Sequence, residues 1–220
     1  MVIDFTRNYL DDDEGNDKYL IVSLVSFFGY MTLMEIIDFF PTRDELLLRK
    51  EIKELTLTKQ LITIKPFNER TYFTTLHIKN AGLGYKLRVK HIQICKFIRY
   101  LLNSKDENGY LINTLERIGT GTAPFIVYIV CNNSIYFLAH MPREKISLYE
   151  RVIHTDDKIF EEEEKEHARR QSSDTPYTIT DERDRIIIVD NEEDMERVKM
   201  NHVKFIVCPK GKNFLIKDVS

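Results

Sequence analysis

The sequence predicts an α+β protein that has a helical N-terminal module and a small C-terminal α/β module with a mixed sheet. In residues 18–104, apolar side chains recur at helical spacing and two β-branched segments follow them. In residues 105–220, apolar runs of strand length are separated by charged segments. The 220 residues suffice for two small domains. We therefore divide the chain into an acidic flexible lead (1–17), the helical domain (18–104) and the α/β domain (105–220).

The first helix is predicted from about residue 17 to residue 28. The acidic run before it ends at Asp17, whose carboxylate is expected to cap the positive end of the helix. Leu20, Leu24 and Phe27 then recur at helical spacing. Gly29 follows where helices commonly end, because glycine adopts the left-handed conformation without a Cβ penalty.

Two capping boxes predict the starts of the next two helices. In the first, Thr32 is followed three residues later by Glu35, and in the second Thr42 is followed by Glu45. In each pattern a hydroxyl and a glutamate satisfy backbone N–H groups that the helix leaves unpaired.

The second helix is expected to be short and the third long. The second spans about 33–39, because Pro41 disfavours helical geometry for the residue before it. The third spans 43–55. Its apolar stripe consists of Leu48, Ile52 and Leu55.

A hairpin and a further helix complete the helical module. The runs 61–65 and 71–78 are predicted to be strands, and turn residues 66–70 separate them. A last helix is predicted over 85–102. Its apolar stripe consists of His91, Ile94, Cys95, Ile98 and Leu101. Three helices followed by a hairpin form the order of a winged helix-turn-helix.

Two stretches of this module resemble bacterial winged-helix regulators. In residues Leu55 to Leu61, an apolar helix end is followed by Thr58-Lys59-Gln60 and then by a strand. This order resembles the segment that connects the second helix of such regulators to the wing. Ile78-Lys79-Asn80-Ala81-Gly82-Leu83-Gly84-Tyr85 resembles the start of their post-wing helix. With the α/β segment that follows, the order is similar to the replication-relaxation family of mobile-element proteins, which pair a winged helix with a restriction-endonuclease-like domain. The resemblance covers residues 18–103 and otherwise only the order of elements, and it implies a bacterial or phage DNA-binding protein.

The α/β module is predicted to combine a hairpin with a β-α-β unit. Its expected elements are a helix at 110–118, strands at 125–131 and 134–140, a charged loop or helix near 155–184, a strand at 185–190, a helix at 192–200, and strands at 203–208 and 214–216. The strands on either side of the helix at 192–200 are expected to pair in parallel.

Charge is segregated along the chain, although its net value is only −3. Residues 1–17 carry one basic and six acidic groups, residues 18–105 carry fifteen and seven, and residues 106–220 carry sixteen and twenty-two. The net charges of the three segments are −5, +8 and −6. A positive segment between negative ones indicates a polyanionic partner and excludes a uniformly basic nucleic-acid coat protein.

The expected site is a set of cations on the winged helix. Long cationic side chains contact phosphates and release counterions. We expect DNA contacts from Arg43, Arg49, Lys50, Lys53, Lys59, Lys65 and Arg70. Glu45, Glu51 and Glu54 interleave with these cations at helical spacing, which is also typical of a solvated helix or of a protein-docking face.

We expect no catalytic residues, no metal site and no cofactor. A nuclease of the endonuclease-like kind needs carboxylates and a Glu-x-Lys or Asp-x-Lys pair on a central strand, and the strands at 125–131 and 134–140 hold no carboxylate. Such pairs occur only elsewhere, at 51–53, 156–158 and 163–165. The scattered histidines and cysteines are expected in the core. Asp190 is expected to cap the helix after its strand.

The location expected for the chain is the cytoplasm. Three cysteines cannot form a disulfide framework, and no signal peptide opens the sequence. The uncharged run from Tyr19 to Met34 has sixteen residues, which falls short of the roughly 20 that cross a bilayer. We therefore expect no membrane partner.

The expected function is sequence-directed binding of double-stranded DNA, as a transcriptional regulator or a replication accessory factor. The link to a mobile element follows from the resemblance alone. The third helix would enter the major groove, and a homodimer would read paired half-sites. Two alternatives stay open: an adaptor whose winged helix contacts protein instead of DNA, and a metal-dependent nuclease-like protein.

Overall fold

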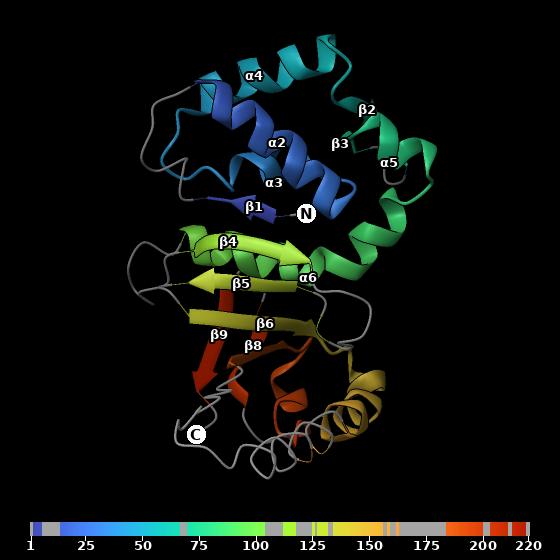
Figure 1. The fold of residues 1–220 in the computed structure, drawn as a ribbon, viewed down its shortest axis with the longest axis vertical. Coiled ribbons are helices and arrows are strands. Elements are labelled where there is room, and N and C mark those ends of the chain that lie inside the picture. The colour runs from blue at the N-terminus through green and yellow to red at the C-terminus, as the bar shows by residue number, and fades with distance from the viewer. Residues whose placement is uncertain are drawn as a thin grey trace, which may run out of the picture. The chain divides into compact units, whose positions relative to one another are not determined.

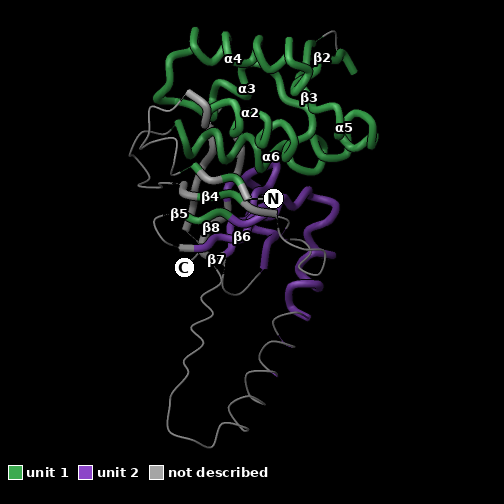
Figure 2. The backbone as a smooth tube through the Cα atoms, turned by 45° about the horizontal axis from the view of Figure 1, so that its top comes forward, with its two compact units in different colours: residues 1–117, 129–134 green, residues 118–128, 135–220 purple. Residues whose placement is uncertain are grey.

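The computed structural model shows a mixed α+β chain, as the sequence predicts. It describes residues 2–5, 14–66, 70–103, 112–117, 125, 127–131, 134–155, 158, 162, 184–199, 203–210 and 213–218. The predicted hairpin tip and most of the charged stretch 155–184 lie outside these residues. The chain divides into two compact units, residues 1–117 with 129–134 and residues 118–128 with 135–220 (Figure 2).

Helices make up most of the described part of the first unit (Figure 1). They are α2 (Glu14–Phe28), α3 (Leu33–Ile37), α4 (Glu45–Leu57), α5 (Leu76–Asn80) and α6 (Gly84–Asn103). α2 contacts α3, α4 and α6. The predicted apolar stripe of α6 is confirmed, because all five of its residues are buried. Burial raises the pKa of the Cys95 thiol in this stripe to about 12, so the thiol stays protonated at neutral pH.

The end of α2 matches the prediction and its start does not. The helix stops before Gly29, which has a φ of +87°. A Cβ at this glycine would also lie 2.6 Å from the carbonyl oxygen of Gly84. Asp17 is not the N-cap, because α2 begins at Glu14 and Asp17 lies inside the helix. Its buried carboxylate pairs with Arg43 instead of with the first amide groups of the helix.

The first predicted capping box is confirmed and the second is wrong. Thr32 Oγ1 accepts a hydrogen bond from the N–H of Glu35 at 3.2 Å, and Glu35 Oε2 accepts one from the N–H of Thr32 at 2.8 Å. At α4 the carboxylate of Asp44, rather than the hydroxyl of Thr42, accepts hydrogen bonds from two N–H groups of the first turn. α4 therefore begins two residues later than predicted.

A two-stranded hairpin follows α4. β2 (Ile62–Ile64) pairs antiparallel with β3 (Tyr72–Thr74). Met31, which lies between α2 and α3, forms a further antiparallel bridge with Phe73 of β3. The second strand is shorter than predicted, because the side chain of Thr75 caps α5 and the chain turns into a helix there.

Within the predicted flexible lead, residues 2–4 form a strand, and residues 6–13 lie outside the described part. β1 (Val2–Asp4) pairs antiparallel with β4 (Ile112–Arg117), and Ile3 lies opposite Leu115. Both of these apolar side chains are buried. The helix predicted over β4 is therefore wrong, and the first unit extends past residue 105, the boundary that the sequence predicts for the α/β domain.

The second unit contains a mixed sheet, as predicted. Its strands include β6 (Ser134–His140), β7 (Asp184–Ile188), β8 (Val203–Lys210) and β9 (Asn213–Asp218). β7 pairs in parallel with both β6 and β8, and β9 pairs antiparallel with β8. The predicted parallel pair is thus confirmed. The helix predicted between its strands is wrong: the described residues of this segment contain the short 3-10 turn η2 (Glu192–Asp194) instead, and the buried carboxylate of Asp194 contacts the side chains of Asn191, Arg143 and Arg197.

An apolar core lies within the second unit. Met141, Ile146, Ile187 and Val189 are among its buried residues. Residues 146–155 are helical and follow the 3-10 turn η1 (Arg143–Lys145). β5 (Val127–Cys131) confirms a further predicted strand, and its residues are shared between the two units.

Candidate nucleic-acid interface

One side of α4 is packed into the first unit. Its buried stripe is the predicted one: Leu48, Ile52 and Leu55. Two ion pairs with α2 hold the helix as well. Arg43 Nε lies 3.3 Å from Asp17 Oδ2, just before α4 begins. Lys18 Nζ lies 2.7 Å from Glu54 Oε2, near its other end. The opposite side of α4 is therefore presented to solvent in a fixed orientation within this unit.

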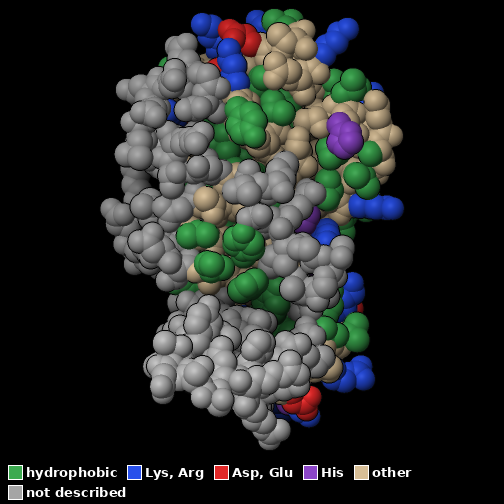
Figure 3. All heavy atoms as spheres, viewed as in Figure 1, with side chains coloured by type: hydrophobic (Ala, Val, Ile, Leu, Met, Phe, Trp, Pro, Cys, Tyr) green, Lys and Arg blue, Asp and Glu red, His purple; other side chains and the backbone are tan. Residues whose placement is uncertain are grey.

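The exposed side of α4 combines basic and apolar side chains. We call it the outer face, and it consists of Leu46, Leu47, Arg49, Lys50 and Lys53, all of them exposed. Leu46 is 76% exposed and Leu47 is 56% exposed, so the first turn presents apolar surface to solvent. Figure 3 shows Lys and Arg side chains beside hydrophobic and acidic ones at the top of the view, where Figure 1 places α4.

The cations of the outer face differ in their partners. Arg49 forms an ion pair with Glu45, one helical turn earlier, at 2.6 Å. Within the part of the chain that the structure describes, no salt bridge involves Lys50 or Lys53. A polyanion can therefore approach these two lysines without breaking a salt bridge to a described residue, although the charge of Glu54 attracts Lys50.

Arg43 lies apart from the outer face, although the sequence predicts it as a DNA contact. Its side chain is only 20% exposed and precedes the first turn of α4. Burial raises the pKa of the Asp17 carboxyl, and the positive charge of Arg43 offsets this effect only in part. The Arg43–Asp17 pair joins α2 to the start of α4, which makes Arg43 a residue that positions the helix.

The other predicted cations follow α4. Lys59 is exposed and has a φ of +60°, in the left-handed region. Lys65 and Arg70 are also exposed, and they flank residues 67–69 of the hairpin tip, which lie outside the described part. The structure thus gathers Arg49, Lys50 and Lys53 on one helix face and places the remaining cations on the segments that come after it.

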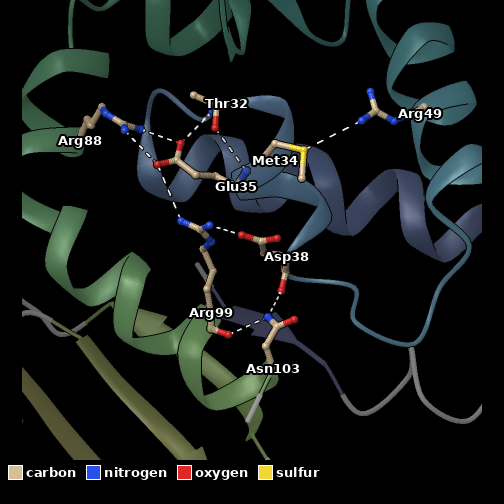
Figure 4. A network of polar contacts seen from close by, with 8 residues as sticks. All are labelled: Thr32, Met34, Glu35, Asp38, Arg49, Arg88, Arg99 and Asn103. Atoms are coloured by element: carbon tan, nitrogen blue, oxygen red, sulfur yellow. Dashed lines mark hydrogen bonds and ion pairs between the residues drawn. The ribbon is translucent and has the colours of Figure 1, made fainter. Parts of the chain in front are cut away.

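A polar network joins α3 to α6 (Figure 4). Arg88 donates two hydrogen bonds to the carboxylate of Glu35, from Nη1 to Oε2 at 3.0 Å and from Nη2 to Oε1 at 2.9 Å. Arg99 lies 3.9 Å from Glu35 Oε1 and also pairs with Asp38. Bidentate arginine–carboxylate geometry is directional, so these contacts fix the position of the short helix α3 against α6.

The surroundings of Glu35 favour its ionised form. Burial by itself raises the pKa of this carboxyl, but the hydrogen bonds and the charge of Arg88 lead the effects that outweigh burial and hold the pKa below its usual range. Arg88 also donates to the carbonyl oxygen of Tyr30 at 2.6 Å, and its guanidinium lies 4.8 Å from the centre of the Tyr72 ring. Arg88 therefore connects the segment before α3 with the hairpin.

Sequence reasoning misses this network, because it assigns Glu35 only to the capping box. A signal is present on the predicted last helix. Arg88 and Arg99 are eleven residues apart, about three helical turns, so they share one face of α6. Two arginines on one face next to a buried stripe indicate a carboxylate partner on a neighbouring element.

A second polar cluster lies at the C-terminal ends of β6 and β7, where His140 is the last residue of β6 and Asp190 follows β7 by two residues. His140 Nε2 lies 2.9 Å from Asp190 Oδ1. Asp190 is therefore a partner of His140 rather than the predicted helix cap, and His140 is partly exposed rather than a core residue. Among the described residues, no group of three or more His, Cys, Asp or Glu side chains could hold a metal ion.

Neither the protein families nor the curated proteins give a relative of this chain. No protein-family model matches the chain, and no curated protein matches it closely. Across the described residues, no helix combines the length and the apolar character that crossing a membrane requires. The functional proposal below therefore depends on the geometry and the charge of this chain itself.

Proposed function

We propose that this chain binds double-stranded DNA through the outer face of α4, with the β2–β3 hairpin acting as a wing. The observation that supports this proposal most is that α4 is amphipathic. Its leucine and isoleucine stripe is buried, whereas Lys50 and Lys53 on the other side are exposed and form no salt bridge with any described residue. Exposed cations on a rigid helix suit phosphate contact, because each contact releases counterions from the DNA.

The order of elements in the first unit supports a winged helix-turn-helix. The helices α2, α3 and α4 precede the hairpin, and the bridge from Met31 to Phe73 ties the segment between the first two helices to β3. The Arg88 contacts to Glu35 and Tyr72 hold α3 and the hairpin to the same helix. A helix-turn-helix and a wing held together in this way form one binding unit.

The charge distribution also favours a polyanionic partner. Residues 18–105, which contain all the predicted DNA contacts, have a net charge of +8, and residues 106–220 have a net charge of −6. DNA would be attracted to the first segment and repelled by the second. We assign the acidic part of the chain to pairing, ligand sensing or partner contact rather than to DNA contact.

In this proposal α4 lies in the major groove and the wing contacts the adjacent backbone. Lys50 and Lys53 contact phosphates, and Lys59, Lys65 and Arg70 extend the contact beyond the helix. A homodimer would place two such helices at half-sites about one turn of DNA apart. The role would be that of a transcriptional regulator or a replication accessory factor, and the resemblance to the replication-relaxation family suggests a mobile element.

The test is an affinity measurement with matched variants. Fluorescence anisotropy of a labelled random duplex of about 20 base pairs, two turns of DNA, gives Kd for the full chain. We expect Lys50→Ala/Lys53→Ala to raise Kd by about tenfold or more, because two phosphates are no longer neutralised. The exposed lysine Lys96 on α6 provides the control, and Lys96→Ala is expected to change Kd by less than about twofold. Exposed lysine-to-alanine changes preserve helix propensity, and circular dichroism checks the fold.

The alternatives predict different results. Exposed leucines on the outer face also suit a protein partner, and an adaptor would bind neither this duplex nor any other. A nuclease would nick supercoiled plasmid when Mg²⁺ is added and would lose that activity with EDTA. Equal Kd values for the double variant and the wild type would also contradict the proposed face.

A further inference from the structure

We propose that Leu46 and Leu47 make this chain prefer thymine, by contacting the C5-methyl groups of thymines in the major groove. This inference rests on the proposed function, because it requires α4 to lie in the groove. It adds to that function a base preference and the two residues that determine it.

The starting observation is the exposure of two adjacent leucines at the first turn of α4. Leu46 and Leu47 are 76% and 56% exposed, and they belong to the same outer face as Lys50 and Lys53. The residues at the N-terminal end of a helix in the major groove are those that reach the base edges. The leucines are therefore placed where a recognition helix reads sequence.

The chemistry of the groove identifies the contact. The base edges in the major groove present hydrogen-bond donors, hydrogen-bond acceptors and one apolar group, the C5-methyl of thymine. Leucine has no hydrogen-bonding group in its side chain, so a leucine pressed against any other base edge would desolvate polar atoms without replacing their hydrogen bonds. Apolar contact with a thymine methyl is the favourable alternative.

The first turn is rigid enough for such a contact to discriminate between bases. The carboxylate of Asp44 accepts hydrogen bonds from the N–H groups of Leu46 at 2.7 Å and of Leu47 at 3.0 Å. Leu46 and Lys50 are four residues apart, and Lys53 follows three residues later, so the three side chains lie along one stripe. This arrangement lets the lysines contact phosphates while the leucine faces the bases.

The positive charge beside the leucines favours DNA over an apolar protein partner as the occupant of this face. Lys50 and Lys53 would be left beside an uncharged surface in an apolar docking site, whereas DNA supplies phosphates along both edges of the groove. An acidic protein segment with apolar residues is the other occupant that this chemistry admits, and the experiment below separates it from DNA.

The test removes only the thymine methyl. A random duplex pool is enriched for binding to the full chain and then amplified with either dTTP or dUTP, which yields two pools of the same sequences with and without the C5-methyl. We expect the uracil pool to bind more weakly by about fourfold for each thymine methyl that the leucines contact, the factor for one buried methyl-sized group. Leu46→Ala/Leu47→Ala should bind the two pools equally, because no leucine is left to sense the methyl.

The matched control is Leu57, which is 73% exposed at the other end of α4 and lies about 16 Å from Leu46 along the helix axis. Leu57→Ala should retain the full difference between the pools. Equal binding of both pools by the wild type would overturn the thymine preference and leave DNA binding intact. A wild type that binds neither pool would overturn the proposed function, and a difference that persists in Leu46→Ala/Leu47→Ala would overturn the assignment of the residues.

Discussion

Lys59 has a backbone conformation that lysine rarely adopts. Its φ of +60° lies in the left-handed region, which costs an L-residue other than glycine about 1–2 kcal/mol. The position directly follows the C-cap of α4, where glycine is the usual residue. Strain of this kind persists when the surrounding structure determines it, and it is common at functional sites. In our proposal, the positive charge of Lys59 contacts DNA at the end of α4, and this contact accounts for a lysine at a strained position.

We predict that Lys59→Gly separates stability from binding. Relief of the left-handed strain should raise the free energy of unfolding by about 1 kcal/mol, while removal of the cation should weaken DNA binding. Urea denaturation measures the first effect and anisotropy the second. Lys59→Ala is the control, since it removes the charge and keeps the strain. If Lys59→Gly leaves Kd for DNA unchanged, Lys59 does not belong to the DNA interface.

Single residues also show where sequence reasoning reaches its limit. Gly29 can be predicted as the end of α2, because its signal is local and needs no partner. Equally local signals predict Asp17 as an N-cap, and it instead pairs with Arg43, which is 26 residues away in the sequence. A carboxylate near a helix start has several possible partners, and a distant cation determines which one it binds.

At the scale of secondary-structure elements, the polar network sets how α3 is held. α3 has only five residues, too few to be stable alone, so its position depends on contacts with longer helices. Glu35 closes the capping box at the start of α3 and pairs with Arg88 of α6, and Asp38 at the end of α3 pairs with Arg99 of α6. The position of α3 therefore depends on the carboxylates of Glu35 and Asp38.

We predict that Glu35→Gln destabilises the first unit in a pH-dependent way. Removal of the charged partner of Arg88 should lower the free energy of unfolding by roughly 2 kcal/mol at neutral pH. The pKa of Glu35 is lowered in the folded state, so its contribution is present above its ordinary value of 4.5 and is lost as pH falls through the lower folded value. The difference in unfolding free energy between wild type and variant should therefore shrink below pH 4.5.

Denaturant titrations of the two proteins at a series of pH values measure this difference. Asp17 acts in the opposite sense, because its pKa is raised in the folded state and its contribution is lost as pH rises through that value. Comparing the two proteins at each pH cancels this contribution. Glu45→Gln is the matched control, since its exposed ion pair with Arg49 should contribute less than about 1 kcal/mol. A difference that is independent of pH would contradict the role of the Glu35 charge.

Elements with strong periodicity can be predicted and elements that depend on pairing cannot. The buried stripes of α4 and α6 follow from helical spacing, and both are confirmed. The sequence predicts a helix where β4 lies, because its six residues show no strict alternation. Its strand geometry comes from β1, which lies more than a hundred residues earlier in the sequence. The same holds for the candidate site. The cations of α4 can be predicted from the sequence, whereas the position of Arg43 away from the outer face cannot, because it depends on the pairing of Arg43 with Asp17 of α2.

At the scale of the whole molecule, the boundary of net charge and the boundaries of the compact units do not coincide. The first compact unit runs to Arg117, because β1 and β4 belong to it, and it also includes residues 129–134. The boundary of net charge lies near residue 105. The proposed DNA contacts all lie within the positive segment, and electrostatic attraction to DNA should therefore be a property of that segment.

The most direct test of this account is the salt dependence of DNA affinity. Between about 50 mM and 200 mM salt, a plot of log affinity against log salt concentration should have a slope of about −3 or steeper, since each phosphate contact contributes about −0.9. Lys50→Ala/Lys53→Ala should make that slope shallower by about 1.8. A wild-type slope near zero, or the same slope in the double variant, would show that the outer face of α4 does not meet the DNA backbone.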